Sequence, residues 1–298
     1  MKRSKAIVTL AIGHRYRTSW RRFCEANWRQ YTDKHGYDLI CIEEPLDSSA
    51  RASQRSPAWQ KCLILSQSFA REYERVVWLD ADILINSRAA PCVVDAVPVE
   101  KAGAVEVFSE PKPELYAEAL RRMYEYWGPV TIANYSPEDY YRNWGLPGGF
   151  DKVLSSGTLV LSPAHHREIL EHVYYGYEEK GGPEWNLEMR PLGYELQKAG
   201  VVHWIDHRFV LNWYEYRFLY YPFLIDWRVS PSLPARLRRK VGRLLRLPSD
   251  ERLKRACVRA AFLNSFFMHL TGGLWDDARL VDLSVSSWRD CRVEQRAA

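Results

Sequence analysis

Long apolar runs and paired cysteines are both missing from this sequence. No stretch approaches the roughly 18–20 apolar residues that a helix needs to cross a bilayer, which speaks against a helical membrane span. The six cysteines are scattered without a Cys-x-x-Cys motif, so they offer neither a zinc cluster nor a disulfide framework. We expect reduced cysteines that serve as small hydrophobic residues. An internal repeat and a clear linker are also lacking, so we expect a single domain over residues 1–298.

The composition is that of a folded domain rather than of a disordered or fibrous chain. Of the 298 residues, 47% are hydrophobic and 27% are charged, which is enough apolar material for a sizeable core. Near the N-terminus, residues 6–12 form an apolar stretch with no small-residue cleavage site after it. That stretch fits a first β-strand better than a signal peptide, so we expect a cytoplasmic protein.

Positive charge is concentrated in one segment. The chain carries 42 Lys and Arg against 37 Asp and Glu, a net charge of +5, while residues 236–259 alone hold ten basic and two acidic residues, a local +8. The other 274 residues therefore sum to −3. A nucleic-acid-binding protein would spread its positive charge over a whole face, so we expect no nucleic-acid partner.

This basic segment has the pattern of an amphipathic helix. Between residues 236 and 247, apolar residues recur at helical spacing and basic residues fill the rest of the wheel. The pattern is typical of a helix on an anionic membrane surface, and as much of a surface helix whose apolar side faces the core. We interpret residues 214–265 as a basic helical insertion. Under the first interpretation, residues 236–259 would place the protein on the inner face of the membrane.

Strand-like and helix-like stretches alternate along the chain, which predicts an α/β fold with a mostly parallel sheet flanked by helices. Ser56-Pro57 and Ser162-Pro163 each combine a capping hydroxyl with a proline in the first turn, a helix-start signal. The expected strands are residues 5–12, 37–42, 75–79, 102–108, 157–161 and 201–205. The expected helices are residues 19–35, 56–73, 114–127, 163 to a stop at 181–182, and 184–199, with irregular stretches at 45–55 and 128–153.

Two carboxylates follow one of these apolar strands, residues 75–79. Val76-Val77-Trp78-Leu79 runs directly into Asp80-Ala81-Asp82. The carboxyl edge of an open α/β sheet is where ligands bind, and residues i and i+2 of an extended chain point the same way. Both acids can therefore face one ion, and their oxygen ligands suit Mg²⁺ or Mn²⁺. A solvated turn is the plainer interpretation of an Asp-x-Asp motif.

Three further features belong to the same context. Lys61 lies on the helix that leads into this strand and could reach the same edge. Ser155-Ser156-Gly157 puts small residues at the start of a strand, where a ligand can approach closely. His269 ends an apolar run and precedes two glycines. Each has a plainer interpretation: a solvated lysine, a loop-to-strand turn and a structural histidine.

These four blocks, in this order, resemble the retaining glycosyltransferases with the GT-A fold. The similarity is to the glycogenin and lipopolysaccharide galactosyltransferase family and to the galactomannan and xyloglucan transferase family, from about residue 6 to residue 275. The resemblance implies a transferase of the cell envelope polysaccharide type that moves a hexose from a nucleotide sugar, UDP-linked, to a glycan or glycolipid acceptor. It also implies a bound Mn²⁺ or Mg²⁺ held by Asp80, Asp82 and His269.

The resemblance also assigns the nucleotide sugar to particular residues. The end of the first strand would hold the base and ribose, with Tyr16 as a stacking ring, and Lys61 would lie near the phosphates or the sugar. The implied nucleotide-sugar-binding residues are Thr9, Ala11, Ile12, Gly13, Tyr16, Lys61, Ala81, Ser156, Gly157 and Gly272.

The sequence departs from the family's pattern at several positions. The family has Asn where Ser155 stands, and a late lysine that is absent near residues 274–275. In place of the family's acid-Gln pair, the best equivalent is Glu188-Met189, which makes Glu188 the candidate catalytic carboxylate. Glu184 and Glu195 on the same predicted helix compete with it. A carboxylate there would stabilise positive character on the sugar or attack it.

Two other functions fit parts of the pattern. A nucleotidyltransferase also binds metal-bound phosphates on an α/β sheet, but such enzymes open with a Gly-rich phosphate loop after the first strand. Here that stretch is Gly13-His14-Arg15-Tyr16-Arg17, which speaks against it. A non-catalytic module that binds sugar or membrane remains the alternative if Asp80 and Asp82 bind no metal.

Overall fold

The computed structural model describes residues 3–107, 113–127, 136–180, 187–224, 241, 250–271 and 274–284. Its main sheet has six strands in the order β2-β1-β3-β6-β5-β7. All run in one direction except β6, which is antiparallel to both neighbours, so the predicted mostly parallel sheet is confirmed. The strands are β1 (Arg3–Leu10), β2 (Asp38–Ile42), β3 (Tyr73–Leu79), β5 (Ala102–Glu106), β6 (Leu154–Leu161) and β7 (Val202–Trp204).

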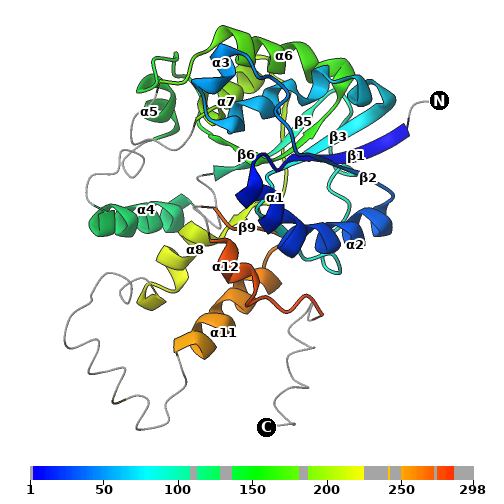
Figure 1. The fold of residues 1–298 in the computed structure, drawn as a ribbon. Coiled ribbons are helices and arrows are strands. Elements are labelled where there is room, and N and C mark those ends of the chain that lie inside the picture. Colours follow the sequence, from blue (N-terminus) through cyan, green and yellow to red (C-terminus); the bar gives the residue numbers. More distant parts are fainter. Residues whose placement is uncertain are drawn as a thin grey trace.

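Helices cover both faces of this sheet (Figure 1). The face of Val76 and Trp78 packs under the 3₁₀ helix η2 (Pro57–Ser66) and the helices α6 (Pro163–Gly176) and α7 (Met189–Lys198). The face of Val77 and Leu79 packs on a continuous helical stretch formed by α1 (His14–Trp20), the π-helical turn η1 (Arg21–Glu25) and α2 (Ala26–His35). Alternation along β3 therefore divides its apolar residues between two cores, as expected for a strand buried on both faces.

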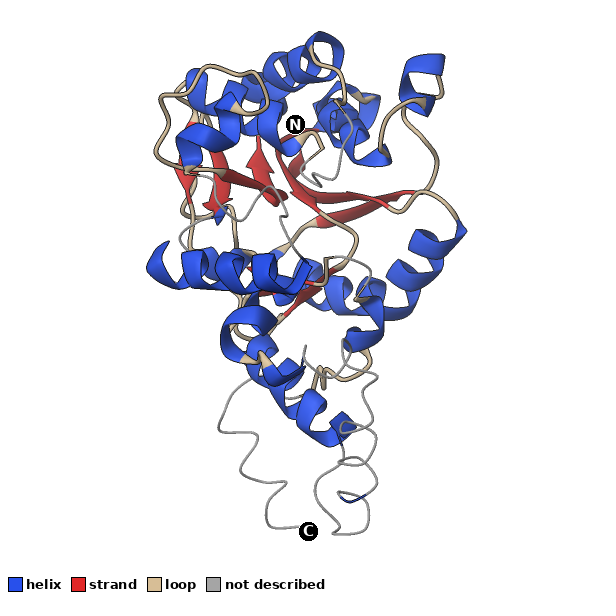
Figure 2. Ribbon diagram, turned by 90° about the vertical axis from the view of Figure 1, so that its left-hand side faces the viewer, coloured by secondary structure: helices blue, strands red, loops and turns tan. Residues whose placement is uncertain are grey.

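A second, smaller sheet lies below the first, at its carboxyl edge (Figure 2). It consists of β4 (Ile83–Ile85), β9 (Phe267–His269) and β8 (Leu211–Asn212), in the order β4-β9-β8. β4 follows Asp82 directly and pairs antiparallel with β9, which places Ile83 opposite His269. These three short strands were not predicted from the sequence.

The remaining helices lie mostly around this second sheet (Figure 1). Within the described residues, no helix is both long and apolar enough to span a bilayer. Residues 236–240 and 242–249 of the basic segment lie outside the described residues, so its membrane contact stays a prediction. The helices are α3 (Ala50–Ser53), η3 (Ser68–Glu72), α4 (Pro113–Trp127), α5 (Pro137–Arg142), η6 (His207–Phe209), α8 (Trp213–Tyr220), α11 (Asp250–Leu263) and α12 (Trp275–Ala278).

Several predicted boundaries were wrong. The helix expected over 56–73 is two 3₁₀ helices, and its last residue, Tyr73, begins β3. The expected irregular stretch 128–153 contains α5, because Ser136 caps a helix whose first residue is Pro137. The helix α6 ends at Gly176, before the predicted glycine stop, which lies outside the described residues. The five described cysteines are unpaired, as expected.

The start of α6 differs from the predicted serine cap. The Ser162 side chain makes no capping hydrogen bond; instead its backbone N–H donates to Nδ1 of His166, at 2.9 Å. The other ring nitrogen lies 3.2 Å from the carbonyl oxygen of Glu100. His166 is completely buried, and this burial lowers its pKa to about 4. The neutral ring therefore fits the site, because a protonated Nδ1 would face another donor.

The stability of the protein should depend on pH through His166. The pKa of this group is lower in the folded state than in the unfolded chain, so stability is lost as the pH falls from about 6.5 towards 4. We expect a loss of up to about 3 kcal/mol over that window. The His166→Gln variant should show a flatter pH dependence in urea unfolding. An equal slope for both proteins would contradict this assignment.

The outer edge of β4 is completed by side chains of α2. Asn27 donates through Nδ2 to the Ile85 carbonyl at 2.6 Å and accepts through Oδ1 from the Ile85 N–H at 2.7 Å. The indole N–H of Trp28 donates to the Ile83 carbonyl at 2.8 Å. The amide of Asn27 thus takes the place of a neighbouring strand, and β4 is hydrogen-bonded on both sides.

Removing this amide should destabilise the protein strongly. Asn27→Ala leaves a buried N–H and a buried carbonyl of Ile85 without partners, which should lower the free energy of unfolding by about 2–4 kcal/mol. Arg29→Ala, an exposed change on the same helix that removes an i,i+4 ion pair with Glu25, should cost less than about 0.5 kcal/mol. Urea unfolding of both variants measures the difference, and equal losses would be the contrary result.

Candidate active site

The two predicted acids lie where the two sheets meet. Asp80 follows the last residue of β3, and its backbone N–H donates to the carbonyl of Gly157 on β6 at 2.9 Å. Asp82 precedes β4 and accepts through its backbone carbonyl from the N–H of Leu270 at 2.9 Å. The motif is therefore a turn that joins the two sheets, closed by a hydrogen bond from the Ile83 N–H to the Asp80 carbonyl, and its two acids are only partly exposed to solvent.

His269 is brought to these acids by the pairing of β9 with β4. Its Nε2 lies 3.0 Å from Oδ1 of Asp82 and 3.5 Å from Oδ2 of Asp80. One ligand atom from each of the three residues lies within 4.8 Å of the others, which is the geometry of a possible metal site. Two carboxylates and an imidazole suit Mn²⁺ and related divalent ions.

Gly157 makes the space for this cluster. A Cβ atom at this position would lie 2.9 Å from Nδ1 of His269 and 3.6 Å from Oδ2 of Asp80. Any side chain would therefore push the imidazole away from the carboxylates. The predicted role of Gly157 as a close-approach residue is consistent with this geometry, and the group that approaches is the histidine.

Asp82 and His269 attract each other electrostatically. Burial works to lower the pKa of His269, but Asp82 outweighs it and the pKa is raised above its ordinary value. Burial works to raise the pKa of Asp82, and His269 outweighs it and holds that pKa below its ordinary value. Each group thus stabilises the charged form of the other.

Lys61 reaches the site from η2. Its ammonium is almost completely buried, 2.7 Å from Oε1 of Glu188 and 3.1 Å from Oδ1 of Asp80. It also donates to the hydroxyl of Ser156 at 3.2 Å and to the Ser156 carbonyl at 3.3 Å. Burial alone would lower the pKa of Lys61, but Asp80 and Glu188 outweigh it and raise that pKa. A solvated lysine, the plainer interpretation, is excluded by this position.

Of the candidate carboxylates that the structure describes, Glu188 is the one that lies beside Lys61. It precedes α7, is buried, and accepts from the Ser156 hydroxyl at 2.9 Å in addition to Lys61. Glu195 lies elsewhere, accepting from the Tyr177 hydroxyl at 2.5 Å and from Lys198 at 3.3 Å. Glu184 lies outside the described residues.

The predicted base-binding residues lie at the end of β1, on the same edge of the sheet as Asp80. Thr9 is fully buried, and its hydroxyl has no hydrogen-bond partner among the described residues. Ala11 is buried as well, and Ile12 is half-buried. Gly13 is exposed with φ of 85° and ψ of 157°, a conformation essentially restricted to glycine. That turn carries the chain from the strand into α1.

An aromatic pair joins α1 to α12. Tyr16 on α1 is 50% exposed, and its ring packs edge-on against Trp275 with centroids 6.2 Å apart. Partial burial, followed by the negative charge of Asp82, raises the pKa of Tyr16. The side chain of Ala81 is buried in the core. Gly272 lies outside the described residues.

Sequence reasoning missed two residues of this site. The indole N–H of Trp78 donates to Oδ1 of Asp80 at 2.8 Å, so this carboxylate oxygen is oriented by both Trp78 and Lys61. Trp275 was considered only as part of a departure from the family pattern. The alternation that puts residues 78 and 80 on one side of an extended chain is a signal that could have identified Trp78.

Comparison with known proteins gives structural matches only. No family model matches the chain, and no curated protein matches it. A glycosyltransferase involved in the glycosylation of the major capsid of PBCV-1 is 13% identical over 92% of this chain and 98% of its own, with a TM-score of 0.49. An active-site mutant of LgtC is 12% identical over 94% of this chain and 95% of its own, with a TM-score of 0.43.

The bifunctional glycosyltransferase WbbM, in its apo structure, is 11% identical over 99% of this chain, with a TM-score of 0.50. This chain spans about half of that protein, 52% of its length. The chain therefore has the GT-A type of α/β fold that its sequence motifs predicted.

Proposed function

We propose that this protein is a metal-dependent, retaining glycosyltransferase that transfers a hexose from a UDP-linked sugar to a saccharide or lipid-linked acceptor. The observation that carries the proposal is the convergence of Asp80, Asp82 and His269, with Lys61 and Glu188 beside them, at the carboxyl edge of the sheet. Ligands bind at that edge in open α/β folds. Solved glycosyltransferases among the structural matches support the same reaction class.

The three ligand residues fit a divalent cation. Their donor atoms lie within 4.8 Å of one another, and Gly157 leaves the room that the imidazole needs. When bound, Mn²⁺ or Mg²⁺ would supply a positive charge that stabilises the diphosphate of the leaving nucleotide. Trp78 and Lys61 orient Asp80, so this ligand is held in place before any ion arrives.

Glu188 and Lys61 supply opposite charges next to this ligand set. Breaking the bond between sugar and phosphate builds positive character on the sugar, which the Glu188 carboxylate would stabilise or attack. The Lys61 ammonium and the Ser156 hydroxyl hold that carboxylate in place. In the proposed complex, Lys61 lies near the phosphates or the sugar of the donor. Tyr16 would offer a ring for stacking on the base.

The Asp80→Ala and Asp82→Ala variants should lose metal-dependent nucleotide binding. In isothermal titration, the wild-type protein should bind UDP at least about tenfold more tightly with Mn²⁺ than without it, because an ion held by the carboxylates would offset the negative charge of the diphosphate. Either variant should lose this difference, together with transfer from UDP-sugars, and should remain folded.

Asp33→Ala, which removes an exposed acid on α2, is the matched control and should bind UDP and Mn²⁺ like the wild type. Unchanged turnover in purified Asp80→Ala or Asp82→Ala would rule out the proposed site. If the wild-type protein binds neither Mn²⁺ nor UDP, the result would instead favour the interpretation as a non-catalytic sugar-binding module.

Glu188 and Glu195 offer a test of the catalytic carboxylate. Glu188→Gln keeps an acceptor for Lys61 and Ser156 but removes the negative charge, so kcat should fall at least about 100-fold while binding of UDP with Mn²⁺ stays. Glu195→Gln, which lies within α7 and is bonded to Tyr177, should change kcat less than about twofold. Steady-state kinetics with UDP-sugars measures both, and similar values for the two variants would contradict the assignment.

A further inference from the structure

The helix that carries Lys61 depends on contacts from outside itself. η2 is a 3₁₀ helix of ten residues, whereas such helices rarely exceed 3–4 residues because their hydrogen bonds are poorly aligned. Its apolar side chains are buried against the sheet, which fixes its depth in the core. Burial alone does not fix its position along its own axis, and that position determines where the Lys61 ammonium lies.

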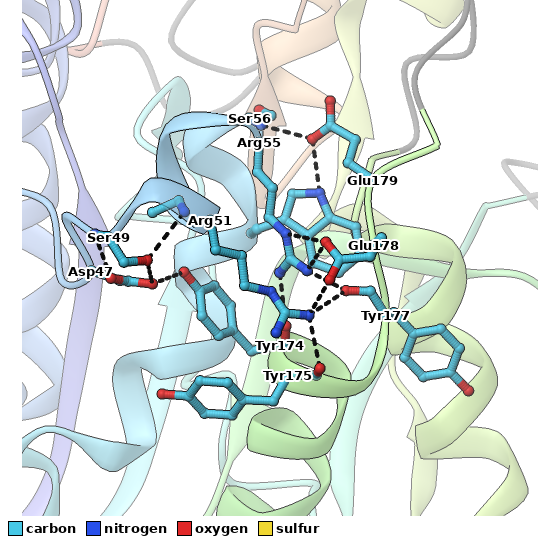
Figure 3. A network of polar contacts seen from close by, with 12 residues as sticks. Asp47, Ser49, Arg51, Arg55, Ser56, Tyr174, Tyr175, Tyr177, Glu178 and Glu179 are labelled. Atoms are coloured by element: carbon cyan, nitrogen blue, oxygen red, sulfur yellow. Dashed lines mark hydrogen bonds and ion pairs between the residues drawn. The ribbon is translucent and has the colours of Figure 1, made fainter.

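One carboxylate oxygen accepts two hydrogen bonds at the start of this helix (Figure 3). Oε2 of Glu179 accepts from the backbone N–H of Ser56 at 2.7 Å and from the indole N–H of Trp59 at 2.9 Å. The first donor belongs to the residue that caps η2, and the second to a completely buried ring one turn later. A single acceptor shared by two successive turns fixes both the axial position and the rotation of the helix.

Trp59, the second donor to Glu179, lies two residues before Lys61. The Lys61 ammonium has partners at 2.7 Å and 3.1 Å on two different carboxylates, so a shift of η2 by about 1 Å would break at least one of these contacts. Among the described residues, Glu179 has no hydrogen bond or ion pair with the groups that we assign to metal, donor or chemistry. It follows α6 in the chain and precedes the segment that leads to Glu188.

The neighbouring Glu178 forms ion pairs with arginines instead of accepting hydrogen bonds from η2. It pairs with Arg51 and Arg55, each at 2.6 Å, and its side chain is 68% exposed. Arg55 also donates to the carbonyls of Tyr174 and Tyr177 at the end of α6, and thereby holds the loop before η2. Glu178 makes no contact with a donor of η2 itself among the described residues. Glu178 is therefore a matched control for Glu179: it is the adjacent glutamate, but its partners are the arginines rather than η2.

We propose that Glu179 is a positioning residue that sets the place of Lys61 between Asp80 and Glu188 by fixing the start of η2. The proposal rests on the function proposed above for its effect on catalysis. Its structural part is independent of that function. Glu179→Ala removes the acceptor, Glu179→Gln keeps an amide carbonyl that can accept both hydrogen bonds, and Glu178→Ala is the control.

Kinetics with UDP-sugars should separate the three variants. We expect Glu179→Ala to lower kcat about 10–100-fold with less than about a threefold change in the KM for the donor, because a displacement of about 1 Å acts on the chemical step. Glu179→Gln should keep at least about half of the wild-type kcat, and Glu178→Ala should stay within about twofold of it. Full activity of Glu179→Ala, or a Glu179→Gln variant as slow as Glu179→Ala, would overturn the proposal.

Crystal structures decide the positioning without any activity measurement. In Glu179→Ala, the Lys61 ammonium should leave hydrogen-bond distance of Asp80 or Glu188; if it keeps both contacts, the proposal is wrong. Should Glu179→Ala not fold, Trp59→Phe removes one of the two donors and should show a smaller shift in the same direction. Absence of transfer in the wild-type protein would defeat the proposed function instead, and the crystal structures would still decide the role of Glu179.

Discussion

The buried ammonium of Lys61 is the interaction on which the rest of the site depends. It joins η2 to Asp80, to Glu188 and to Ser156, which come from three other segments of the chain. Glu188 is only 3% exposed, and a carboxylate at such a position without a counter-charge would destabilise the fold by several kcal/mol. The lysine therefore makes it possible to bury a carboxylate next to a ligand-binding edge. Because each partner holds the others, moving any one of these segments disturbs all of them.

The second sheet imposes a comparable constraint on the other side of the site. Asp80 ends a strand of the main sheet, and Asp82 precedes a strand of the small one, so the motif spans the junction. The pairing of Ile83 with His269 brings a histidine from 187 residues further along the chain to these acids. Asn27 and Trp28 complete the opposite edge of β4. The position of the histidine is thus set by backbone pairing rather than by attraction to an ion.

The sequence predicted the parts of this arrangement that have a local signal. The local order of residues was enough to find two features. One is the apolar strand that runs into Asp80 and Asp82, and the other is the histidine at the end of an apolar run. The strands β4, β8 and β9 have two or three residues each, too few to show a period, and only their pairing defines them. Glu188 was the candidate carboxylate in a helix expected to start at residue 184, and Glu195 on the same expected helix competed with it. They differ because α7 starts at Met189, which leaves Glu188 before the first turn, facing Lys61. Likewise, apolar spacing could not distinguish a 3₁₀ helix from an α-helix over residues 57–66.

Charge balance connects the proposed cation to the nucleotide. Asp80, Asp82 and Glu188 contribute three negative charges when ionised, and Lys61 contributes one positive charge, so the cluster with a neutral His269 carries a net charge of −2. Such a cluster repels a diphosphate. Protonation of His269, which Asp82 favours, removes only part of this charge, and a protonated imidazole cannot be a ligand. In the proposed function, a divalent cation held by Asp80, Asp82 and His269 would bring the sum to zero and would compete with the proton for the imidazole nitrogen. The diphosphate would therefore bind well only with the ion present, and the positive charge of Lys61 reduces the negative charge that such an ion would have to offset.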